Sequence, residues 1–442
     1  MPITKVDVKP AHEQKQLDAI PWQELVSKKK QQLVGAIPEK WKLHVSLVRE
    51  LTEANEGRLL ELDPARRSGV LDDVELDITE SYSAVELVNK MALGRLTATQ
   101  VVTAFCKRAA VAQQLDTFKV VGLDATAGFV NGLNLSLNAG GSSGGEGALV
   151  AFRGSPMGVG TDIAGSIRIP AMCCRNYGFK PTNHRVPYGN QSEGVILSLP
   201  GPFPSAGPIA STMEDLQLFM SAIINQRPST YDATALDLPW RKPAVGQSLR
   251  LGVLEEDPAW PLHPPVRRAF KDAINALSVA GHEVVRLPYD YERSVDLGLR
   301  LSYQFFELAH PPEEDLEAVL GEPLVKAAAA RMHPFTAKPR PVPKDLAEPW
   351  HHLDDLDAAR AKFAETWHRT WFDHKLDAIV APGADKTAVP HDTYGLMPYT
   401  VVFNLLDTLD PEPVKAQDPF LPDWHCQMIR VQLTELPAAF KL

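Results

Sequence analysis

This chain of 442 residues has only four cysteines, no long apolar run and no excess of positive charge. Its four cysteines show no metal-ligand spacing, and we expect the adjacent Cys173 and Cys174 to pack as small apolar side chains. A net charge of −10 argues against a nucleic-acid-binding surface. We find no internal repeat and no low-complexity segment. The composition therefore excludes metal-ribbon, repeat and nucleic-acid-binding classes.

Membrane and targeting signals are also missing. No uninterrupted apolar run approaches the roughly 18 residues of a membrane span, and the segment from Met1 to Val8 has no apolar targeting region. We expect a cytoplasmic protein without a membrane or nucleic-acid partner. A hydrophobic content of 44% is enough to bury a sizeable core, which favours one large α/β domain.

Two glycine- and serine-rich turns carry most of the functional information. The first runs from Gly140 to Gly147 and the second from Thr161 to Pro170, and the apolar segment from Ala148 to Val159 joins them. Glycine allows a backbone with positive φ and exposed N–H groups, and a serine hydroxyl becomes nucleophilic when a base removes its proton. The pair of turns therefore predicts an active site built around serine.

Other interpretations of these turns are weaker. A phosphate-binding loop requires a lysine after the glycines, where this chain has Glu146. A Ser-His-Asp hydrolase requires a strand before its Gly-x-Ser-x-Gly motif, and the two matches, centred on Ser142 and Ser143, have none. His184 is interpreted as a surface turn residue. Glu146 is a second candidate base, although its charge suits the start of a helix better.

The run from Gly140 to Thr182 resembles the amidase signature family, and most closely its fungal acetamidase-like members. The resemblance implies an α/β fold with a central mixed sheet flanked by helices on both faces, and a Ser-cisSer-Lys mechanism. Ser166 then corresponds to the nucleophile that forms the acyl-enzyme, and Ser142 to the serine that follows a cis peptide and relays the proton. The oxyanion hole corresponds to the N–H groups of Ile163, Ala164, Gly165 and Ser166, with Asp162, Arg168, Gly141 and Ser143 as structural support.

The residue types suit this chemistry. Flanking glycines relieve the crowding of a cis peptide, and N–H groups aimed at a tetrahedral oxyanion are worth about 3 to 4 kcal/mol each. Ala164 stands where the family usually has glycine, and its Cβ would strain a turn that required positive φ there.

The lysine of the triad is missing. Leu115 occupies its position, just before the family-like run from Asp116 to Val120, and leucine cannot accept a proton. Lys119 is the alternative base, but along a strand it lies about 13 Å away from that position. A solvated role is expected for Lys119.

Segments of the family pattern are absent near residues 115, 131 and 407. We divide the chain into an N-terminal helical wrap (1–73), anchored by Trp22 and Trp41, and an amidase signature domain (74–442) whose core spans about 87–216. The missing segments indicate lost coding sequence, and the loss of a core strand would leave unpaired sheet edges.

Beyond the signature core, the pattern predicts a strand over 250–254, a helix over 266–277 and a strand over 283–287. It also predicts a late core strand over 377–382 and a proline-rich surface loop over 333–350.

The resemblance implies hydrolysis of a small-molecule carboxylic amide to acid and amine, without a metal or organic cofactor. It is compatible with a monomer or a homodimer. The alternative is a catalytically inactive remnant that keeps a binding cleft or does not fold stably.

Overall fold

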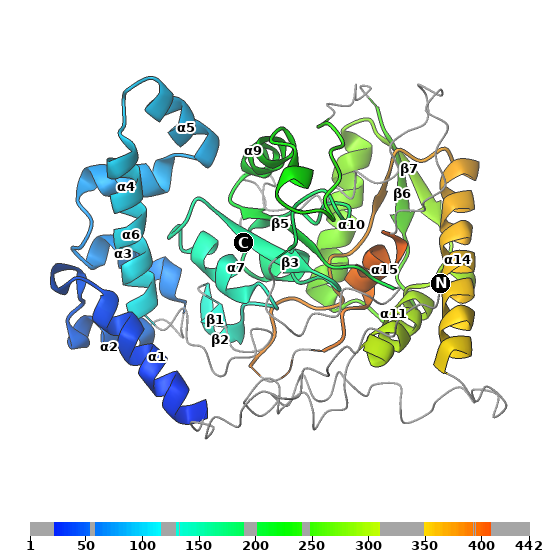
Figure 1. The fold of residues 1–442 in the computed structure, drawn as a ribbon, viewed down its shortest axis with the longest axis horizontal. Helices are drawn as coiled ribbons and strands as arrows, with labels where there is room; N and C mark the ends of the chain where they lie inside the picture. The colour runs from blue at the N-terminus through cyan, green and yellow to red at the C-terminus, as the bar shows by residue number, and fades with distance from the viewer. Residues whose placement is uncertain are drawn as a thin grey trace, which may run out of the picture.

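The computed structural model describes residues 22–53, 58–115, 130–131, 133–189, 201–240, 248–309, 349–391, 393 and 395–407. Three groups of elements follow one another along the chain (Figure 1). Helices α1 to α6 form the first group, at the left of Figure 1, strands β1 to β5 with α7 to α9 lie in the centre, and the remaining elements lie at the right.

The first group is helical. Its elements are α1 (Trp22–Ala36), η1 (Glu39–Trp41), α2 (Val45–Glu53), η3 (Leu59–Leu62), α3 (Pro64–Arg67), α4 (Asp73–Ser81), α5 (Ala84–Ala92) and α6 (Ala98–Gln114). Capping boxes start α4, α5 and α6, in which an N-cap side chain and the Glu or Gln three residues later satisfy each other's N–H groups. These local signals explain why the chain forms three separate helices here.

The N-terminal segment packs onto the main body through α6. Gln114 accepts a hydrogen bond from the N–H of Leu43 at 2.8 Å and donates one to the carbonyl of Trp41 at 2.9 Å. Leu51 and Leu59 share one buried apolar cluster with Leu115 of the main body. The backbone of the Trp41 segment is thus held against α6, whereas the side chain of Trp22 lies outside the described residues.

The central group surrounds the two glycine turns. It contains β1 (Val130–Asn131), β2 (Asn134–Asn138), α7 (Gly144–Ala151), β3 (Met157–Asp162), α8 (Arg168–Cys173), β4 (Tyr177–Gly178), β5 (Ser205–Ala210), α9 (Met213–Ile224) and η4 (Pro228–Thr230). Strand β5 is buried along its whole length and pairs antiparallel with β3 on one side and β4 on the other. Among the described strands, β3 therefore forms an edge of its sheet.

The last group begins with the predicted strand-helix-strand unit. It comprises β6 (Arg250–Leu254), α10 (Pro264–Val279), β7 (Glu283–Leu287), η5 (Tyr291–Arg293), α11 (Val295–Ala309), α14 (Pro349–Asp373), β8 (Ala378–Val380) and α15 (Pro398–Leu406). Strand β6 pairs parallel with β7 and with β8, so the strands predicted over 250–254, 283–287 and 377–382 are confirmed. The proline-rich stretch over 333–350 falls mostly outside the described residues.

The mixed α/β class is confirmed. In the described part of the chain the strands form three small sheets, of two, three and three strands, and not one continuous central sheet. The largest apolar cluster lies in the last group, where Trp367 of α14 and Phe403 of α15 pack with Leu287 of β7. Helix α15 is almost completely buried and extends from this cluster to the central group.

Candidate active site

Strand β3 and helix α7 bring the two serine turns together. The N–H of Ser143, which precedes α7, donates to the carbonyl of Ser166 at 3.1 Å. The hydroxyl of Ser143 accepts from the N–H of Thr161 at 3.1 Å, and a Cβ on Gly160 would crowd that hydroxyl at 2.7 Å. A strand that lacks a side chain at this point can therefore lie close against the start of the helix.

The Gly141–Ser142 peptide is cis, where the resemblance implied it. Ser142 and Ser166 are both partly exposed. Each serine lies in one of the two glycine turns, and the backbone hydrogen bond between Ser143 and Ser166 joins these turns. The apolar segment from Ala148 to Val159 thus returns the second turn to the first.

Asp162, the last residue of β3, is the centre of a buried hydrogen-bond network. Its carboxylate accepts from the N–H groups of Gly165 at 2.7 Å and Ile167 at 3.1 Å, and from two nitrogens of Arg168 at 2.9 Å each. Burial raises the pKa of Asp162, but the charge and hydrogen bonds of Arg168, the charge of Lys180 and the Ile167 N–H outweigh burial and hold this pKa well below its usual range. Asp162 therefore braces the turn as an ionised group.

The backbone of the turn shows which N–H groups can act on a substrate. Gly165 has φ of +134°, a conformation that glycine adopts readily, whereas Ala164 keeps a negative φ. The alanine thus fits without the strain that its Cβ would cause at positive φ. Since the Gly165 N–H already donates to Asp162, the N–H groups available for an oxyanion are those of Ile163, Ala164 and Ser166, which have no acceptor among the described residues.

Sequence analysis missed two residues of α15 that contact this turn. The hydroxyl of Thr400 donates to the carbonyl of Ala164 at 2.6 Å, and the amide of Asn404 donates to the carboxylate and the carbonyl of Asp162 at 3.1 and 3.2 Å. The available signal was two polar residues four positions apart in an otherwise apolar segment, which places them on one helix face.

The expected base position is apolar in the structure. Leu115 is the C-cap of α6 and is fully buried in a cluster that also contains Leu51 and Phe152. Phe152 follows the C-terminal end of α7, whereas Ser142 precedes its N-terminal end, and a helix of eight residues is about 12 Å long. Lys119 lies outside the described residues.

The other candidate bases make contacts with groups other than Ser142. His184 has positive φ, as in a turn, and its ring packs on Phe203 at 5.9 Å. Burial raises the pKa of Glu146, whose carboxylate lies over Gly158 of β3. Within the described part of the chain no lysine amine bonds to Ser142. The amine of Lys90 lies over the ring of Tyr82, and acidic side chains contact the amines of Lys42, Lys107, Lys180, Lys362 and Lys386.

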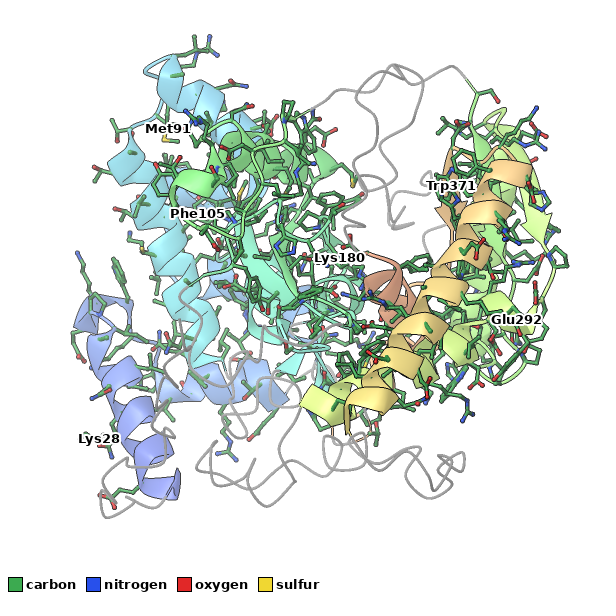
Figure 2. The ribbon with its side chains drawn as sticks, turned by 45° about the vertical axis from the view of Figure 1, so that its right-hand side comes forward. Lys28, Met91, Phe105, Lys180, Glu292 and Trp371 are labelled. Atoms are coloured by element: carbon green, nitrogen blue, oxygen red, sulfur yellow. The ribbon has the colours of Figure 1, made fainter. Side chains whose placement is uncertain are left out.

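Lys180 illustrates this point. It forms a buried ion pair with Asp407, just after α15, and also donates to the carbonyl of Pro181 at 3.0 Å. Figure 2 shows Lys180 beside α15. Asn183 donates to the carbonyl of Asp407 at 2.7 Å, so the end of α15 is tied to the central group at the position where the family pattern breaks off.

A cavity of about 150 Å³ lies elsewhere, between α4, α5 and the start of α9. Polar side chains of Glu80, Tyr82, Arg153 and Asp215 line it, and the serine pair does not.

Among the described residues, no group of three His, Cys, Asp or Glu side chains could hold a metal ion. No helix in that part of the chain is long and apolar enough to cross a membrane.

Comparison with known proteins agrees with the geometry. The family model described as Amidase matches residues 124–418, which is more than half of the chain. An amidase of Gibberella moniliformis is 29% identical over 87% of this chain and 88% of its own length, and an acetamidase of Aspergillus oryzae is 28% identical over 87% and 86%. The first alignment spans 483 positions, more than the 442 residues of this chain, so parts of that relative have no counterpart here.

A solved structure shows the fold. A fatty acid amide hydrolase superimposes with a TM-score of 0.72 over 87% of this chain and 82% of its own, at 22% sequence identity. The serine turns, the family match and the shared fold agree with one another, and the chain therefore belongs to the amidase family, hydrolases that act on the carbon–nitrogen bonds of amides.

Proposed function

We propose that this chain keeps the site of a carboxylic amide hydrolase that works through an acyl-enzyme on Ser166, with Ser142 as the proton relay. The Ser166 oxygen attacks the amide carbon, and the N–H groups of Ile163, Ala164 and Ser166 stabilise the oxyanion. The amine leaves with a proton, and water then attacks the ester carbon, so that the acid leaves and Ser166 regains its proton. The observation that carries the proposal is the hydrogen bond from Ser143 to Ser166, which joins the two serine turns.

Protonation of the leaving amine is the weak step of this site. With Leu115 buried in an apolar cluster, the proton relay has no lysine at the position that the resemblance implies. Loss of a triad member costs a serine hydrolase about 10⁶ in rate while leaving about 10³ to 10⁴ over water. We therefore propose that activated acyl donors acylate Ser166, whereas simple carboxamides turn over too slowly to measure. The length difference from the amidase relative supports the proposal that segments are missing.

The second candidate is an inactive remnant that retains a binding cleft, and the burial of Leu115 favours it. A cytoplasmic location and the absence of a nucleic-acid or membrane partner remain part of our proposal, supported by the net charge of −10.

An active ester separates the two candidates, because its leaving group needs no proton. With p-nitrophenyl acetate, an acylating site releases a burst of one p-nitrophenol per chain before a slow steady state. We expect this burst from the native chain, none from Ser166→Ala, and a slower burst from Ser142→Ala. A well-folded native chain without a burst supports the inactive remnant. Hydrolysis of a simple carboxamide that depends on Ser166 would show that another group replaces the lysine.

A further inference from the structure

Helix α15 and the turn that carries Ser166 contact each other across more than 230 positions of sequence. Thr400 and Asn404 lie four residues apart in this helix and therefore face the same direction. Both are almost completely buried, and among the described residues their polar contacts with the central group all go to the segment from Asp162 to Arg168. These two polar residues are therefore dedicated to the turn.

Asn404 holds the start of the turn. Its amide nitrogen donates to the carbonyl of Asp162 at 3.2 Å and to its carboxylate at 3.1 Å, and its oxygen accepts from Arg168 at 2.5 Å. In a planar trans peptide the C=O and the following N–H point in opposite directions. Since the Asp162 carbonyl is turned toward α15, the N–H of Ile163 is turned away from α15.

Thr400 holds the middle of the turn in the same way. Its hydroxyl donates to the carbonyl of Ala164 at 2.6 Å, which fixes the plane of the Ala164–Gly165 peptide and aims the Gly165 N–H at Asp162. Its own carbonyl accepts from Arg168 at 3.0 Å. A Cβ on Gly165 would overlap the Thr400 hydroxyl, so contact between α15 and the turn is close.

We propose that Thr400 and Asn404 are positioning residues that orient the peptide planes of the oxyanion turn. This inference rests on the proposed acylation of Ser166. Neither side chain touches the substrate. Asn404 sets the direction of the Ile163 N–H, and Thr400 fixes the neighbouring Ala164–Gly165 peptide, so that the Ala164 N–H lies between two held peptide planes. Their loss should therefore slow the covalent step and leave the binding of a probe nearly unchanged.

The test uses the full chain and a fluorophosphonate probe, whose phosphorus is attacked by the serine oxygen as its fluoride leaves. Thr400→Val keeps the shape of the side chain without its hydroxyl, and Thr400→Ser keeps the hydroxyl. We expect Thr400→Val and Asn404→Leu to lower the rate constant of the covalent step by roughly 10- to 100-fold, as a small misplacement of catalytic groups does. The apparent affinity for the probe should change by less than about threefold, and Thr400→Ser should restore the rate to within about threefold of the native chain.

Val402→Ala is the matched control, because Val402 lies in the same helix and belongs to the apolar cluster of the last group. It should lower the melting temperature and leave the rate of the covalent step unchanged. Equal rates for the native chain and Thr400→Val, or a loss in Val402→Ala as large as in Thr400→Val, would overturn the positioning role.

Amide hydrogen exchange keeps the two proposals distinguishable. If the native chain takes up no probe, the proposed acylation fails, and exchange at Gly165, whose N–H donates to Asp162, then decides the positioning role. We expect faster exchange there in Thr400→Val and Asn404→Leu than in the native chain or Val402→Ala. Unchanged exchange in those two variants would contradict the inference.

Discussion

The backbone N–H of Ser143 lies 3.1 Å from the carbonyl oxygen of Ser166 and donates a hydrogen bond to it. This contact joins the start of α7 to the turn after β3 without using any side chain. The backbone therefore contributes directly to the relative position of the two serine turns, and this contact uses neither the Ser142 nor the Ser166 hydroxyl. Substitutions of these hydroxyls should consequently leave the geometry of the turns intact.

Removal of the charge of Asp162 should destabilise the protein strongly. Asp162→Asn leaves the guanidinium of Arg168 buried without its ionic partner, which typically costs about 3 to 5 kcal/mol in the free energy of unfolding. Urea unfolding of the two proteins near neutral pH measures this difference. Glu365→Gln is the control, because the pair of Glu365 with Arg369 is exposed and its loss should matter little. Equal effects of the two substitutions would contradict the bracing role of Asp162.

The same carboxylate predicts a dependence of stability on acid. The pKa of Asp162 is lower in the folded chain than the value of about 3.9 in an unfolded chain. Its contribution to stability is therefore complete above about pH 4 and is lost as the pH falls toward the folded-state pKa. We expect the difference in unfolding free energy between the native chain and Asp162→Asn to shrink below about pH 4, and a constant difference across that range would be inconsistent with this pKa.

A lysine at position 115 should not create a working triad. Leu115→Lys would place an ammonium group in the cluster that contains Phe152, at the far end of α7 from Ser142. We expect a large loss of unfolding free energy, because a buried and unpaired charge is costly, and no increase in the rate of probe labelling. Leu115→Met keeps the apolar volume and should change both quantities little. Faster labelling of Leu115→Lys than of Leu115→Met would show that position 115 does reach Ser142.

Neutralising Glu146 should stabilise the protein at neutral pH. Burial raises the pKa of Glu146, so this carboxyl favours folding most below the unfolded-state pKa of about 4.3 and loses that contribution as the pH rises through the folded-state value. Glu146→Gln stays uncharged at every pH. Thermal melts should show a higher melting temperature than the native chain near pH 7 and a smaller difference near pH 4. The reverse order would indicate that the ionised carboxylate of Glu146 is stabilised in the fold.

Strand β3 should make the chain prone to self-association. It forms a sheet edge among the described strands, and its Val159 side chain is 53% exposed. An exposed apolar edge strand is a template for pairing with another chain, and a lysine on such a strand opposes that pairing. We expect Val159→Lys to lower light scattering during concentration of the protein, relative to the native chain and to Val159→Thr. Identical scattering of all three proteins would place the aggregating surface elsewhere.

Local patterns in the sequence predicted more of this fold than of its active-site contacts. The apolar stripe of α10 and the flanking β6 and β7 follow from residue periodicity, and the serine turns follow from their glycines. The roles of Thr400 and Asn404 could not be predicted, because they depend on a contact between segments more than 230 residues apart. The hydrogen bond from the Gly165 N–H to Asp162 likewise depends on the orientation of the Asp162 carboxylate, which no local sequence pattern specifies.

The residue that a serine-reactive probe modifies tests the assignment of Ser166 as the nucleophile. The full chain is treated with a fluorophosphonate, digested, and examined by peptide mass spectrometry, with Ser166→Ala and Ser143→Ala treated in parallel. We expect slow attachment of one probe per chain at Ser166, retained in Ser143→Ala and absent from Ser166→Ala. Attachment at another residue, or equal labelling of the native chain and Ser166→Ala, would contradict the assignment of Ser166 as the nucleophile.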